Sequence, residues 1–188
     1  APPAERRSIG DRSFIKNALL ACIRIAGLDR TRYDEFMKKS GVVHASDGQE
    51  ARLFFHYPGV PLTAEDAETL DRFAVILREA TELCERNGSR LVVVYIPTKF
   101  RVYGGLCRFA AYSPCAAWSL NDLPERVRAL VAKVFPSVAF LDLTAPFRAE
   151  AARGPLLYYA DDTHWSPEGQ ALAGRLLADY LATSDAGR

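Results

Sequence analysis

The feature that most constrains the fold is the run Leu91-Val92-Val93-Val94-Tyr95-Ile96. It is almost entirely apolar and rich in β-branched side chains, as expected of a strand buried on both faces of a parallel sheet. Pro97 follows it and ends the strand, because proline has no N–H to donate to a neighbouring strand. The run therefore predicts a core strand of an α/β domain.

The segments around this strand alternate between helix and strand. Thr63 can cap a helix that carries Glu65 and Asp66 in its first turn and ends at Asn87-Gly88. The pattern then predicts a loop from Thr98 to Leu120, a helix near Leu123 to Phe135, a second buried strand from Val138 to Leu143, and a loop from Thr144 to His164. A last helix begins with Ser166 as N-cap and Pro167 in its first turn. This order is typical of the α/β class.

The N-terminal part has a weaker pattern. We expect residues 1–50 to form a helical arm, and residues 51–188 to form the α/β domain, beginning with a short strand over Arg52 to Tyr57. The chain begins Ala1-Pro2-Pro3 without an initiator Met, which favours a segment upstream of Ala1.

Composition and charge limit the kinds of partner that the sequence supports. With 24 Lys and Arg against 23 Asp and Glu, the net charge of +1 gives no electrostatic reason to expect nucleic acid or an anionic membrane. The longest apolar run is far shorter than the roughly 20 residues that span a bilayer. The cysteines show no metal-ligand spacing, and no cofactor is predicted. A disulfide between Cys107 and Cys115 is left open; it would favour an extracytoplasmic location, periplasmic or secreted.

The segment Asp161-Asp162-Thr163-His164 is the strongest candidate for chemistry. A carboxylate beside an imidazole can fix its tautomer and leave the other ring nitrogen free to accept a proton. An Asp-rich turn before a helix is also common as a purely structural feature. Trp165 could hold the loop or serve as a core anchor, and a metal here would need ligands from elsewhere in the chain.

A family resemblance adds to this interpretation. The run from Tyr158 to Gly169 resembles the last conserved block of the SGNH (GDSL-type) hydrolases, and is most similar to the alginate O-acetyltransferase-like branch in its Asp-Thr-His-Trp sequence. The stretch from Leu91 to Lys99, with Val102-Tyr103, is similar to a strand-Pro-Thr-Lys segment of the same relatives. The likeness covers roughly residues 64–183.

The resemblance implies a flavodoxin-like three-layer α/β/α sandwich with a parallel sheet, short of its first strands here. It also implies a serine esterase or O-acetyltransferase acting on acylated carbohydrate. By motif position, His164 matches the general base. Asp162 matches the orienting acid of the Asp-x-His form, which we favour, and Asp161 that of the Asp-x-x-His form.

The family's Gly-Asp-Ser nucleophile turn is not recognisable. Gly10-Asp11-Arg12-Ser13 has an inserted Arg and no preceding strand. We therefore interpret Ser13 as a helix cap in preference to a nucleophile. Two explanations remain: the nucleophile lies in an upstream part of the polypeptide, which we favour, or the chain keeps the fold without the reaction. The second reading makes it a non-catalytic module that binds carbohydrate or a partner protein.

Candidate substrate-binding residues lie in the same loops. Lys99 could approach a polar or anionic group of the substrate, and Tyr103, Tyr159 and Trp165 could offer stacking surfaces. Because His44 and His56 have no carboxylate at a useful spacing, we expect both to be ordinary surface or packed residues.

Overall fold

The computed structural model describes residues 30–45 and 48–186. The chain divides into two compact units, Ala1–Lys38 and Lys39–Arg188. In the first, the described element is helix α2 (Arg30–Lys38). Every element below belongs to the second unit.

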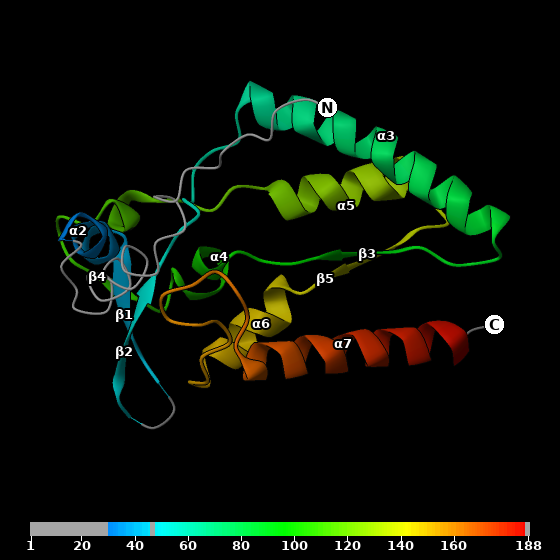
Figure 1. Cartoon of the computed structure of the whole chain (residues 1–188). Helices are drawn as coiled ribbons and strands as arrows, with labels where there is room; N and C mark the ends of the chain where they lie inside the picture. The colour runs from blue at the N-terminus through cyan, green and yellow to red at the C-terminus, as the bar shows by residue number, and fades with distance from the viewer. Residues whose placement is uncertain (1–29, 46–47, 187–188) are drawn as a thin grey trace, which may run out of the picture. The chain divides into compact units, whose positions relative to one another are not determined.

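A pair of parallel strands forms the centre of this unit. β3 (Val92–Tyr95) runs beside β5 (Ala139–Asp142), with Val92 opposite Ala139 and Tyr95 opposite Asp142. Helices α3 (Ala64–Arg86) and α5 (Leu123–Val134) lie on one side of the pair (Figure 1). Helices α6 (Thr144–Ala151) and α7 (Pro167–Ala186) lie on the other side.

Alternating side chains of the strands bury both faces. Val93 and Phe140 pack into the cluster that contains Leu77 and Val131 of the first helix layer. Their neighbours Val94 and Leu141 pack into the second cluster with core residues of α6 and α7. The result is a mixed α/β unit with a small parallel sheet.

This sheet is smaller than the predicted flavodoxin-like sandwich. Over residues 30–45 and 48–186, β3 pairs with β5 only, so one of its edges lacks a strand neighbour. All four residues of β3 are therefore half-buried, where full burial was expected, and Ile96 is exposed.

A second, antiparallel sheet has the strand order β2-β1-β4. It consists of β1 (Ser40–His44), β2 (Glu50–Phe54) and β4 (Arg108–Phe109). Within the predicted helical arm, residues 40–44 form a strand: Val42 and Val43 favour an extended backbone, and Val43 is buried against the core that β2 also covers. The compact unit therefore begins at Lys39, whereas most of the predicted arm lies outside the described residues.

Two predicted loops contain short helices. α4 (Lys99–Tyr103) follows β3 directly and is capped by Thr98, whose Oγ1 accepts a hydrogen bond from the amide of Arg101 at 3.3 Å. A 3-10 helix (Pro114–Ala117) follows β4, and α6 follows β5. All five residues of α4 are buried, which decides the roles of Lys99 and Tyr103 below.

Cys107 and Cys115, which flank β4, carry free thiols. They are not bonded to each other. Burial raises the pKa of the Cys107 thiol to about 12. The structure thus removes the disulfide as a reason to expect an extracytoplasmic location. In the described part of the chain, no helix combines the length and apolar character needed to cross a bilayer.

Candidate active site at the loop before the last helix

The Asp-His segment lies on a loop that is tied together at its base. Tyr158 and Trp165 form an antiparallel bridge, and the amide of Ser166 donates to the carbonyl of Leu157 at 3.1 Å. The amide of Tyr159 donates to the carbonyl of His164 at 3.1 Å. The first turn of α7 approaches closely: a Cβ on Gly169 would lie 2.1 Å from the Leu157 carbonyl oxygen, so only glycine fits there.

Asp162 and His164 contact each other at the tip of this loop. Nδ1 of His164 lies 2.5 Å from Oδ1 of Asp162, and the same oxygen accepts the His164 backbone N–H at 2.9 Å. The backbone donor, and then the imidazole, hold the pKa of Asp162 below its ordinary value. Because a carboxylate can only accept, Nδ1 carries the hydrogen and Nε2 is left as the basic nitrogen of the neutral ring.

The pair is open to solvent. The side chain of His164 is 79% exposed and that of Asp162 is 48% exposed. Within the described residues, Nε2 of His164 has no hydrogen-bond partner. Asp161, the alternative acid, makes no hydrogen bond to the ring. The geometry thus supports Asp162 over Asp161 as the orienting acid.

Lys99 lies under the loop. Its side chain is 5% exposed, and Nζ donates to the carbonyl oxygens of Tyr159 at 2.6 Å and Ala160 at 3.2 Å. Burial lowers the pKa of Lys99 to about 8, although Asp161 and Asp162 oppose this effect. The ammonium group expected to meet substrate is therefore used to hold the backbone just before the Asp-His segment.

The Ala160 carbonyl also accepts the amide of Phe54 at the end of β2, at 2.8 Å. Lys99 and β2 therefore bind the same carbonyl group, so the loop is held by helix α4 and by the antiparallel sheet.

Tyr103, predicted as a substrate-binding residue, is buried in the core. It is 1% exposed, and its hydroxyl donates to the Pro155 carbonyl and accepts the Leu157 amide, both at 2.8 Å. Burial raises its pKa to about 12. The sequence placed Tyr103 in a loop, but helix α4 turns its ring inward.

Trp165 is partly buried and packs its ring against Phe147 of α6, with 5.2 Å between the ring centroids. Its Nε1 is buried and has no hydrogen-bond partner among the described residues. Trp165 therefore fixes the end of the loop while also lining the cavity described next.

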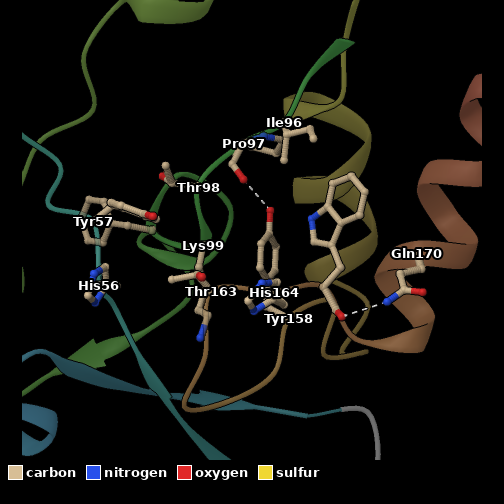
Figure 2. A pocket seen from close by; sticks show the side chains of 12 residues that line it. His56, Tyr57, Ile96, Pro97, Thr98, Lys99, Tyr158, Thr163, His164 and Gln170 are labelled. Atoms are coloured by element: carbon tan, nitrogen blue, oxygen red, sulfur yellow. Dashed lines mark hydrogen bonds between the residues drawn. The ribbon is translucent and has the colours of Figure 1, made fainter. Parts of the chain in front are cut away.

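A cavity of about 470 Å³ opens beside His164. Three segments build it: the end of β2, the turn from β3 into α4, and the Asp-His loop with the start of α7 (Figure 2). Its lining residues are His56, Tyr57, Ile96, Pro97, Thr98, Lys99, Phe100, Tyr158, Thr163, His164, Trp165 and Gln170.

The sequence did not assign His56 and Tyr57 to the site. Their rings meet edge to face at 5.1 Å, and both line this cavity. The available signal was their place at the end of a predicted strand, since strand ends are where sites form. His44, in contrast, lies on β1 beside Glu50 and lines no part of the cavity.

Among the described residues that line the cavity there is no serine. The hydroxyl of Tyr158 donates to the Pro97 carbonyl at 2.6 Å, and that of Thr98 caps α4. Ser13, the weak nucleophile candidate, lies outside the described residues. In residues 30–45 and 48–186, no three His, Cys, Asp or Glu side chains gather as a metal site.

The chain is similar to proteins described as alginate O-acetylases and acetyltransferases. Its residues 48–187 match the family model described as SGNH hydrolase-like domain, acetyltransferase AlgX. It is 31% identical over 153 residues to a probable alginate O-acetylase AlgJ of Azotobacter vinelandii, covering 80% of this chain and 36% of that protein. A protein of the same description from Pseudomonas putida is 28% identical over 120 residues, covering 64% of this chain and 29% of the relative.

A solved structure is also similar. The O-acetyltransferase domain of Pseudomonas putida AlgJ matches with a TM-score of 0.52 and 25% identity, over 78% of this chain and 49% of that one. The chain spans about a third of the curated relatives it matches and about half of this domain. From the family match over residues 48–187, the chain belongs to the SGNH hydrolase-like family of the acetyltransferase AlgX.

Proposed function

We propose that this chain carries the acid-base half of an O-acetyltransferase site for carbohydrate, with His164 as general base and Asp162 as orienting acid. The observation that carries the proposal is the 2.5 Å contact between Nδ1 and Oδ1, which leaves Nε2 unpartnered among the described residues. The adjoining cavity of about 470 Å³ gives room for an acyl group and a sugar hydroxyl.

The chemistry follows the serine acyl-transfer scheme. Nε2 of His164 takes the proton of a serine hydroxyl as its oxygen bonds to the acetyl carbonyl carbon of the donor. The donor's oxygen leaves with that proton, and an acetyl-serine remains. A sugar hydroxyl then attacks the acetyl carbon, His164 takes its proton, and the serine leaves and is reprotonated. The serine is supplied from outside the described residues.

The names of the relatives suggest the acceptor. They are described as probable alginate O-acetylases, and alginate is an acidic polysaccharide. We propose an acidic polysaccharide as acceptor here too. A second candidate, a carbohydrate-binding module without catalysis, is favoured by one observation: no described serine lines the cavity.

Hydrolysis of an activated acetyl ester tests the catalytic proposal. We expect the chain to release acetate faster than His164→Ala. His44→Ala is the matched control because that histidine is exposed and lines no part of the cavity. Equal rates for the unmodified chain and His164→Ala would contradict catalysis by this chain. Polysaccharide binding that survives in His164→Ala together with equal rates would favour the binding module.

A further inference from the structure

A second cavity adjoins the first. It has a volume of about 300 Å³ and shares Tyr57, Thr98 and Phe100 with the cavity beside His164. Tyr57 lines both cavities and is 55% exposed. The second cavity does not include His164, so the two spaces together extend beyond the Asp-His loop.

The second cavity is lined by a buried positive charge. Arg101 of α4 is 9% exposed, and its Nη2 donates to the backbone oxygen of Asn121 at 2.9 Å and to Oδ1 of Asn121 at 2.7 Å. Both partners are neutral. Within the described chain, no carboxylate lies in ion-pair distance of this guanidinium. A buried charge is costly unless an opposite charge or several hydrogen bonds compensate it.

The carboxylate that lines the second cavity, Asp66, is hydrogen-bonded elsewhere. Its Oδ2 accepts both the backbone N–H and the hydroxyl of Thr63 in the cap of α3, which keeps the pKa of Asp66 low. Tyr95 is half-buried in the same wall. Burial raises its pKa, the charge of Arg101 opposes this, and the charge of Asp142 adds to it. Arg101 is thus the one cation that lines this cavity among the described residues.

We propose that the two cavities form one binding groove for an acidic polysaccharide, in which Arg101 binds the carboxylate of a sugar unit and Tyr57 packs against a neighbouring ring. A guanidinium presents a planar fork of donors that matches a carboxylate. An exposed aromatic ring offers an apolar face with a polar tip, which fits the CH-rich face of a pyranose. The identity of the first cavity as the acyl-transfer site rests on the proposed function.

Titration of the intact chain with an unacetylated oligo-uronate and its carboxyl-reduced neutral counterpart tests the proposal. In NMR spectra of protein labelled at arginine side chains, we expect the Arg101 guanidinium signals to shift with the oligo-uronate and not with the neutral oligomer. Binding of the oligo-uronate should weaken as salt is added. No shift at Arg101, or equal affinity for the two oligomers, would overturn the proposal.

Variants sharpen the result. Arg101→Lys keeps the positive charge but loses the planar fork of donors, and we expect it to weaken oligo-uronate binding tenfold or more. Tyr57→Ala should weaken the binding of both oligomers. The controls are Arg86→Gln, at the last turn of α3 and paired with Glu82, and Tyr112→Ala, an exposed tyrosine that lines neither cavity. Affinity of Arg101→Lys equal to that of the unmodified chain would contradict the proposal.

This outcome is separable from catalysis. In His164→Ala we expect the oligo-uronate to keep its advantage in affinity over the neutral oligomer, because His164 does not line the second cavity, where Arg101 lies. Failure of the ester assay with intact selective binding would refute the acyl-transfer proposal alone. Ester hydrolysis that depends on His164, without carboxylate-selective binding, would refute the groove alone.

Discussion

The Asp162–His164 pair and the side chains beneath it differ sharply in burial. The pair is exposed and joined by hydrogen bonds within its own loop. Lys99 and Tyr103 below it are almost fully buried and bond to backbone groups of the same loop and of the segment leading into it. The difference teaches that groups proposed for chemistry and groups that fix their position are separate sets. Substitutions in the two sets should therefore have different consequences.

The largest stability effect should come from Leu157→Ala in the buried set. Leu157 is 1% exposed and belongs to the core cluster shared with Phe147 and Leu172. The lost contacts and the cavity left behind should lower the free energy of unfolding by about 2–5 kcal/mol. Urea unfolding measures this, with the partly exposed Leu181→Ala as control. A loss no greater than the control's would break the comparison.

Tyr103→Phe should have the next largest effect. It removes a hydroxyl that accepts the Leu157 amide and donates to the Pro155 carbonyl, and both backbone groups are left without that partner. A buried group without its partner costs about 1–3 kcal/mol. Urea unfolding would show it, and Tyr112→Phe, at an exposed position, should be neutral. Unchanged stability in Tyr103→Phe would mean that water replaces the hydroxyl.

Lys99→Met should lower stability by on the order of 1 kcal/mol at pH 7 and loosen the loop. The expected signs are faster amide exchange at Tyr159 and a shifted His164 ring signal in NMR spectra. Lys99→Arg, which keeps donors and charge, should restore part of both.

Lys99 also gives a pH test. Its pKa of about 8 in the fold lies below the ordinary 10.5, so the unfolded chain holds this proton more tightly. The contribution of Lys99 to stability should therefore be smallest below pH 8, where both states hold the proton, and should rise as pH increases from about 8 to 10.5. The difference in unfolding free energy between the unmodified chain and Lys99→Met isolates this term. A pH-independent difference would contradict a buried ammonium.

The smallest stability effect should come from Asp162→Asn in the exposed set, within about 0.5 kcal/mol of the unmodified chain. Its effect should instead be chemical: without the carboxylate, the hydrogen is no longer held on Nδ1, and the ¹⁵N shifts of the His164 ring should report a different tautomer mixture. Asp161→Asn should leave those shifts unchanged. The reverse pattern would make Asp161 the orienting acid.

The sequence predicted elements with strong local signals. Thr63 caps α3 as predicted, and the valine run forms β3. The capping box that Thr63 makes with Asp66 is an addition from the structure. The sequence missed α4 and α6, which are too short for a helical stripe, and β1, whose strand depends on partners in β2 and on distant Phe109. Short elements of this kind are stabilised by tertiary contacts that local propensity does not contain.

The same limit applies to the site. Asp162 and His164 are neighbours in sequence, so their contact was predictable from spacing alone. The cavity was not, because His56, Thr98 and His164 come from three distant segments. Lys99 was recognised as notable, but its direction depends on α4, which the sequence did not reveal.

The bridge between Tyr158 and Trp165 has a further consequence for how such a domain can change over evolution. It closes the loop at its base, and the exposed residues Asp161, Asp162 and His164 beyond it are not part of the core cluster that α6 and α7 share. Exposed loop tips tolerate sequence change and insertion better than the elements that flank them. The sequence at the tip can therefore change without altering the core, so a lineage could lose or regain its acid-base pair there while inheriting the same fold.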